Sequence, residues 1–149
     1  MVTVAALYNR MKAIDVKQIS IDTLKETAET AADLNAEQMF KGLRADGSEI
    51  TPSYSDPTIQ IKEAKGQITD HVTLRDSGSF HEKTRVEVDS EKMVFKSIDE
   101  KSARLEKKYS KSNGSIFGLS LPYKREYMNE RVRPTFKKNI QVATRLRMR

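Results

Sequence analysis

The sequence predicts an α+β domain in which a small, mainly antiparallel sheet with a central hairpin is flanked by N-terminal and C-terminal helices. The first observation is a pair of short alternating segments, 84–89 and 93–97, joined by a polar turn. The second is apolar residues at helical spacing on both sides of that pair. The third is the length: 149 residues correspond to about one domain, so we expect 1–149 to fold as a single domain.

The N-terminal part predicts two helices. Apolar residues at helical spacing predict a first helix over about 3–15, and with the break that follows it forms an N-terminal arm, 1–20. A second helix is expected to begin near residue 22 or 23 and to end by Gly42 or Gly47. Its expected inward face consists of Leu24, Ala28, Ala31 or Ala32, Asn35 and Met39.

An extended loop is predicted over 44–58, because Pro52 and Pro57 disfavour regular pairing. After this loop, residues 59–65 fit either a short helix or an edge strand, and we favour the helix. Further along, Asp76-Ser77-Gly78 is a chain-reversal signal, and a tight reversal there would give Gly78 a positive φ.

Beyond the hairpin we expect a short helix over 99–109 and a loop over 110–118 with a turn at Asn113-Gly114. Ile116, Phe117 and Leu119 should form an apolar plug. Two C-terminal helices are then predicted, 122–131 and 134–146, because proline at 134 should kink or restart the helix. Residues 141–149 are expected to act as a basic C-terminal tail.

Composition narrows the class of protein. Hydrophobic residues make up 37% and charged residues 32%, and there is no Trp. This composition predicts a modest hydrophobic core, as expected for a subunit that its neighbours help to stabilise. The absence of Cys excludes a disulfide scaffold, thiolate metal sites and a Cys nucleophile. The first ten residues lack the pattern of a secretory signal, and no apolar run is long enough for a membrane span.

Positive charge is concentrated at the C-terminal end. Residues 1–50 carry a net charge of −2 and residues 51–100 of −3, whereas 101–149 hold 14 basic and 3 acidic residues, or +11. From residue 131 onwards there are seven basic side chains and no acid. This segment is expected to contact DNA or an acidic partner surface. The candidate contact residues are Arg131, Arg133, Lys137, Lys138, Arg145, Arg147 and Arg149.

Signals for catalysis are sparse, and we expect no enzyme activity, no metal and no cofactor. His71 and His81 are interpreted as polar surface or strand-end residues, since their spacing is unlike that of helical zinc pairs. The alternative left open is a Mg²⁺-dependent nuclease built on Asp56, Glu63 and Lys65, which would need Glu63 and Lys65 on one strand and Asp56 on another.

Several short motifs occur in a recognisable order between residues 40 and 140. They are GLRADGSEI at 42–50, Tyr54-Ser55, Lys62, VTLRDSGSF at 72–80, the strand pair, LEKKY at 105–109, IFGL at 116–119, and Arg133-Pro134 through Asn139-Ile140. In this order the chain resembles small structural proteins of tailed phages and prophages of gut bacteria, including the crAss-like phages. It is more distantly similar to the phage virion-morphogenesis or tail-completion family. Ser77 stands where those families often have Thr.

The resemblance implies a non-catalytic subunit of the virion neck or tail, made in the host cytoplasm. Such a subunit would form a homo-oligomeric ring between portal and tail or within the tail. Its expected partners are further copies of itself, neighbouring portal, neck or tail proteins, and packaged DNA passing through the lumen; no membrane is implied. The alternative is a DNA-binding accessory protein that uses the basic C-terminal segment.

Overall fold

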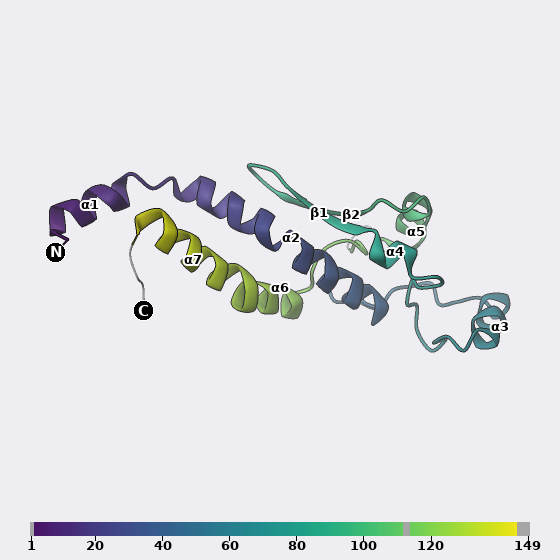
Figure 1. Ribbon diagram of the computed structural model, residues 1–149. Coiled ribbons are helices and arrows are strands. Elements are labelled where there is room, and N and C mark those ends of the chain that lie inside the picture. The colour runs from purple at the N-terminus through teal and green to yellow at the C-terminus, as the bar shows by residue number, and fades with distance from the viewer. Residues whose placement is uncertain (1, 112–113, 146–149) are drawn as a thin grey trace.

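The computed structural model describes residues 2–111 and 114–145. The molecule is elongated, and helix α2 (Val16–Phe40) runs along its middle, with the hairpin on one side and the C-terminal helices on the other (Figure 1). Among the described residues the sheet is a single antiparallel pair, which confirms the predicted α+β class. None of the described helices combines the length and apolarity needed to cross a membrane.

Helix α1 (Val4–Lys12) confirms the first predicted helix. The side chain of Thr3 caps it by accepting a hydrogen bond from the backbone N–H of Ala6 at 3.1 Å. The expected break up to residue 20 is wrong, because α2 begins at Val16. Asp15 accepts a hydrogen bond from the N–H of Gln18 at 2.9 Å, and this cap starts the second helix several residues earlier than expected.

The inward face of α2 consists of small and polar residues. Ala31, Ala32, Asn35 and Met39 are buried, as predicted, and Gln38 is buried with them. The small side chains allow the C-terminal helices to approach closely, and Tyr123, Tyr127, Val132 and Leu119 pack there with Ala31 and Leu34.

The two amides of this face bind the loop that carries the apolar plug. Asn35 Nδ2 donates to the carbonyls of Ile116 and Gly118, each at 3.0 Å. Gln38 Nε2 donates to the Gly118 carbonyl at 2.9 Å, and its Oε1 accepts the N–H of Ser120 at 2.7 Å. These bonds satisfy a buried stretch of backbone that forms no regular structure of its own.

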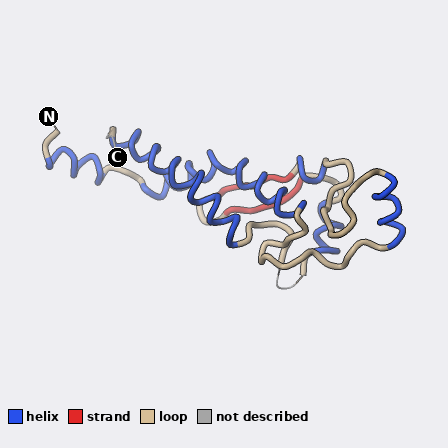
Figure 2. Tube along the Cα trace, turned by 90° about the horizontal axis from the view of Figure 1, so that it is seen from below, coloured by secondary structure: helices blue, strands red, loops and turns tan. Residues whose placement is uncertain are grey.

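Strands β1 (Thr84–Val88) and β2 (Met93–Ser97) form the predicted hairpin, with Val86 opposite Phe95. Figure 2 shows the pair alongside the helices, and Val86, Met93 and Phe95 pack against the helical core. Before β1 lies a short helix that the sequence did not predict, α4 (Ser79–Glu82). It follows Gly78, whose φ of 96° confirms the predicted tight reversal.

The C-terminal helices form one continuous helical run. Helix α6 (Leu121–Tyr127) passes into a π-helical turn, η1 (Met128–Val132), and then into α7 (Arg133–Thr144). Helix α7 starts one residue before the predicted start at 134, with Pro134 in its first turn, but a π-helical turn and not a break joins it to α6. Proline lacks an N–H and its ring clashes with the carbonyl four residues earlier in a regular helix, and the wider turn just before it, closed by the Arg133 N–H on the Met128 carbonyl, relieves that clash.

Of the expected tail over 141–149, residues 141–144 belong to α7 and 146–149 lie outside the described residues. Helix α5 (Ser102–Tyr109) forms within the predicted range 99–109. Of the predicted turn at Asn113-Gly114, Asn113 also lies outside the described residues. In the plug, Ile116 and Leu119 are buried and Phe117 packs partly buried beside them.

The predicted loop over 44–58 ends earlier, because helix α3 (Asp56–Ala64) begins at Asp56 with proline in its first turn. The preference for helix over strand at 59–65 is thereby confirmed as far as Ala64. Residues 44–51 fold back onto the body, where Ile50 is buried and the Arg44 side chain is only 5% exposed.

Candidate functional site

The structure describes five of the seven predicted basic residues, and all five are exposed. In α7 and η1, Arg131 Nε donates to Thr30 Oγ1 at 3.3 Å and Arg133 Nη1 to Asn129 Oδ1 at 2.8 Å. Lys138 Nζ lies 3.5 Å from Glu26 Oε1 on α2. Three of the cations therefore contact their own chain. Arg147 and Arg149 lie outside the described residues.

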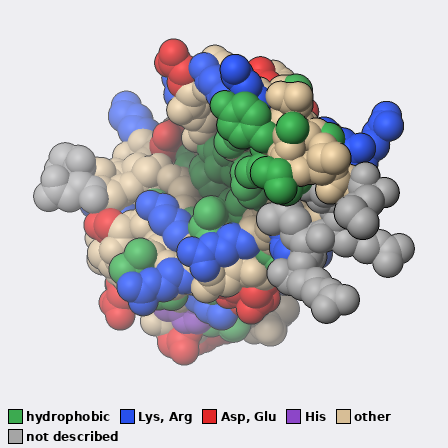
Figure 3. Space-filling model, turned by 90° about the vertical axis from the view of Figure 1, so that its left-hand side faces the viewer, with side chains coloured by type: hydrophobic (Ala, Val, Ile, Leu, Met, Phe, Trp, Pro, Cys, Tyr) green, Lys and Arg blue, Asp and Glu red, His purple; other side chains and the backbone are tan. Residues whose placement is uncertain are grey.

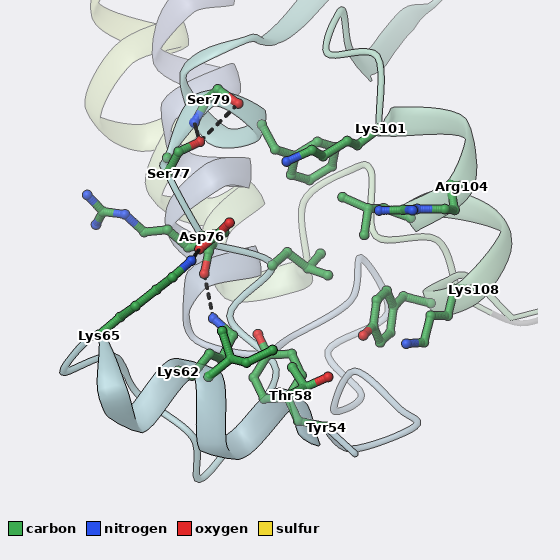
Figure 4. Close-up of a pocket in the computed structure, with 17 residues that line it drawn as sticks. Tyr54, Thr58, Lys62, Lys65, Asp76, Ser77, Ser79, Lys101, Arg104 and Lys108 are labelled. Atoms are coloured by element: carbon green, nitrogen blue, oxygen red, sulfur yellow. Dashed lines mark hydrogen bonds and ion pairs between the residues drawn. The ribbon is translucent and has the colours of Figure 1, made fainter. Parts of the chain in front are cut away.

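A second group of cations surrounds a pocket that the sequence did not predict. The pocket has a volume of about 460 Å³ and lies between α3, residues 74–80 and α5, and we call it the 74–80 pocket (Figure 4). Its apolar wall comprises Ile61, Leu74, Phe80, Leu105 and Tyr109, and its cations are Lys62, Lys65, Arg75, Lys101, Arg104 and Lys108. Apolar and cationic groups thus line the same cavity.

Lys62 is the most buried cation of the pocket, with 7% of its surface exposed. Its Nζ donates to the backbone carbonyl of Arg75 at 2.6 Å and to Gln67 Oε1 at 3.1 Å, and it lies 4.8 Å from the centre of the Tyr54 ring. All of these partners are neutral. Lys62 therefore brings an uncompensated positive charge to the wall of the pocket.

Asp76 is the one acidic residue in the pocket lining. Its Oδ1 lies 2.6 Å from Lys65 Nζ, and this hydrogen bond is the main cause that holds the pKa of Asp76 below its ordinary value. The carboxylate is thus ionised at neutral pH and already paired with a cation. One negative charge leaves most of the positive charge of the pocket unbalanced.

Helix α5 supplies the outer cations. Arg104 and Lys108 are one helical turn apart, so both face the pocket, and Lys101 precedes the helix on the same side (Figure 4). Among the described residues none of these three forms an ion pair. Lys108 Nζ lies 5.0 Å from the ring centre of Tyr109 and covers that face of the ring.

Leu74 has a strained backbone where it borders the pocket. Its φ of 52° is in the left-handed region, which is unfavourable for a branched residue. The preceding residue, Thr73, is held on both sides. Tyr54 Oη accepts its N–H at 2.9 Å, and its carbonyl lies 2.9 Å from His81 Nε2. These contacts fix the conformation that places the Leu74 side chain in the wall.

Both histidines have structural contacts rather than free surface positions, so the interpretation as strand-end residues is corrected. His81 lies in α4, where its Nδ1 is 3.0 Å from the carbonyl of Ala36 on α2. His71 Nε2 is 3.0 Å from the carbonyl of Phe40. Each ring therefore joins the 71–81 segment to the end of α2, and burial lowers the pKa of His81 although the adjacent carbonyls oppose this shift.

The arrangement required for the nuclease alternative is not formed. Asp56, Glu63 and Lys65 lie on α3 or directly after it, instead of on neighbouring strands. Within residues 2–111 and 114–145, no three His, Asp or Glu side chains are grouped so that they could hold a metal ion.

Some of the motifs quoted for the phage resemblance line the pocket, although they are far apart in the sequence, whereas those at 42–50, 116–119 and 133–140 do not. Tyr54, Lys62, residues 74–80 and the LEKKY segment at 105–109 all contribute to its lining. The order of these motifs can be recognised in the sequence. That they meet at one pocket depends on the turns at Gly66 and Gly78 and on the path of residues 71–74, which the sequence does not reveal. No protein-family model, curated protein or solved structure matches the chain.

Proposed function

We propose that the protein is a non-catalytic structural subunit of a tailed-phage virion, located at the head–tail connector, neck or tail. The observation that carries the proposal is helix α1, which projects from one end of the elongated body (Figure 1) and has no buried residue. The resemblance of residues 40–140 to phage neck and tail proteins is the reason for proposing that the assembly is a virion neck or tail.

Three large apolar residues of α1 are exposed. Val4 is 84% exposed, Tyr8 63% and Met11 58%, and their spacing puts them on one face of the helix. In Figure 3, which shows this end of the molecule, hydrophobic side chains gather near the middle, with Lys and Arg side chains around them. A helix of nine residues is marginal in water without tertiary contacts, so this face is suited to burial against another protein.

In the proposed assembly, copies of the chain form a ring, and the apolar face of α1 is buried in a contact between subunits. Exposed basic residues of the C-terminal run such as Lys137 and Arg145 would then recur around the ring axis. They would face packaged DNA or an acidic neck or tail protein. The protein would be located in the virion after assembly in the host cytoplasm.

Mass spectrometry of purified, DNA-filled particles tests the proposal directly. We expect the chain in particles from cells that carry its gene, in a fixed ratio to the portal protein. Particles that are complete, infectious and free of the chain would refute the structural role.

The contribution of α1 can be tested separately with the purified protein. We expect self-association in sedimentation velocity, and we expect the double variant Tyr8→Glu with Met11→Glu to abolish it. Asn9→Glu is the matched control, because Asn9 is equally exposed on the same helix but polar. Loss of association in the control as well would show that charge alone, and not the apolar face, is responsible.

The alternative function, a DNA-binding accessory protein, is favoured by the exposure of Lys137 and Arg145 on the C-terminal run. It requires binding of duplex DNA by the isolated chain that weakens steeply as salt increases. Electrophoretic mobility shift at several salt concentrations tests it, and an isolated chain that leaves duplex DNA unshifted at low salt would remove this alternative.

A further inference from the structure

We propose that the 74–80 pocket is a docking site for a short acidic peptide segment of a neighbouring protein. In the bound state a carboxylate of the segment lies among Lys62, Lys101 and Arg104, and an apolar side chain of the segment contacts Leu74 and Phe80. The proposal rests on the proposed function only in that an assembly partner supplies the segment.

The first argument is charge. Six cations line the pocket and its single acidic residue, Asp76, is already paired with Lys65 at 2.6 Å. Lys62 is nearly buried and has neutral partners only. Positive charges so close together repel one another, and an added carboxylate relieves the repulsion while it gains charge-assisted hydrogen bonds.

The second argument is the apolar wall, which distinguishes a peptide from a nucleic acid. Leu74 and Phe80 belong to the main hydrophobic core, yet both border the cavity. A peptide can bury an apolar side chain there, whereas a phosphate backbone has none. Lys62 and Lys108 lie over the rings of Tyr54 and Tyr109, so a cation covers one face of each ring on which a base could otherwise stack.

The third argument is preorganisation. The Thr73–Leu74 backbone is held by Tyr54 and His81, and the Lys62 ammonium is held by the Arg75 carbonyl at 2.6 Å. A binding wall fixed before the ligand arrives loses little conformational freedom on binding. The strained φ of Leu74 is maintained by these contacts, as is common where a backbone is shaped for a ligand.

The experiment is a screen of the full-length protein against an array of random short peptides, followed by fluorescence polarisation with the strongest binders. We expect the selected peptides to be enriched in Asp or Glu next to Leu, Phe or Ile. Replacement of their acidic residues by Asn or Gln should weaken binding, and high salt should weaken it as well.

Two variants on α5 localise the binding. Arg104 lines the pocket, whereas Lys107 is exposed on the same helix and does not. Arg104→Glu should weaken binding of the selected peptides about fivefold or more, because it replaces an attractive contact by a repulsive one. Lys107→Glu makes the same change of net charge and should leave binding nearly unchanged.

Three results would overturn the proposal. They are an array in which no peptide binds, selected peptides without enrichment in acidic residues, and an equal loss of binding in both variants. A labelled oligonucleotide whose binding is lost in Arg104→Glu but not in Lys107→Glu would instead make the pocket a phosphate site. None of these results bears on whether the chain is present in virions, so the two proposals fail separately.

Discussion

Arg44 is a buried cation whose removal should cost much of the stability of the loop beside it. Its Nε donates to the carbonyl of Tyr109 at 2.8 Å, and Nη1 donates to the carbonyl of Glu49 at 2.7 Å. Nη2 donates to the carbonyl and the Oγ1 of Thr51, at 2.9 and 2.8 Å. One guanidinium thus joins the 44–51 loop to the end of α5.

The change to test is Arg44→Met, which keeps most of the side-chain volume and removes every donor. A hydrogen bond to a charged group contributes about 1.5–3 kcal/mol, and carbonyls left without a donor inside the protein add to the loss. The contributions are not additive, and the variant no longer has to desolvate a charge. We therefore expect a decrease of about 3–4 kcal/mol in the free energy of unfolding.

Circular dichroism during heating and urea titration measures this effect. For a chain of this size, 1 kcal/mol corresponds to about 2–4 °C, so the melting temperature should fall by roughly 10 °C. Arg125→Met is the control, because Arg125 is exposed on α6, and its melting temperature should be unchanged. A loss below about 1 kcal/mol in Arg44→Met would show that water replaces the guanidinium and that the hydrogen bonds add little net stability.

Three further predictions follow from single features. Gly78→Val should lower the free energy of unfolding by about 1 kcal/mol or more, because the φ of 96° is strained for valine. An added Cβ would meet no close neighbour, so the loss comes from the backbone and not from a clash. An unchanged urea midpoint would contradict this prediction. Burial lowers the pKa of His81, so as the pH decreases the unfolded chain takes up a proton on this ring before the folded chain does. The free energy of unfolding should therefore fall as the pH decreases below about 6.5. The urea midpoints of His81→Gln should not show this decrease. Charge reversal at Arg145, Arg147 and Arg149 should reduce the yield of DNA-filled particles while the circular dichroism spectrum is kept; normal infectious yields would mean that this end is only solvated.

The sequence predicted the elements whose signals are local. The alternation in 84–97 located both strands, and small residues located the buried face of α2. In the C-terminal segment the restart of the helix at Pro134 was predicted, but the π-helical turn that joins the two helices was not, although its signal is present in the sequence. The apolar residues Tyr127 and Val132 are five apart, and the π-helical turn accommodates that extra residue, so the apolar face continues towards α2 without a break.

The pocket could not have been predicted, because its residues meet only through long-range contacts. No periodicity indicates that Lys62 will donate to the Arg75 carbonyl, or that Arg44 will join the 44–51 loop to α5. The sequence also did not predict that Asn35 and Gln38 form hydrogen bonds with the backbone of residues 116–120. A buried amide in a helix can be recognised only when its backbone partners are known.

The position of α2 has a mechanical consequence. Its 25 residues span about 38 Å, with α1 at one end and α3, which borders the 74–80 pocket, beyond the other (Figure 1). Because α2 is one continuous helix that packs against the hairpin and the C-terminal run, it sets the distance between its first turn, to which α1 is joined, and the end of the molecule that holds the pocket. Adding four residues to its first part, before Thr23, would lengthen that distance by about 6 Å and would rotate one end relative to the other by only about 40°.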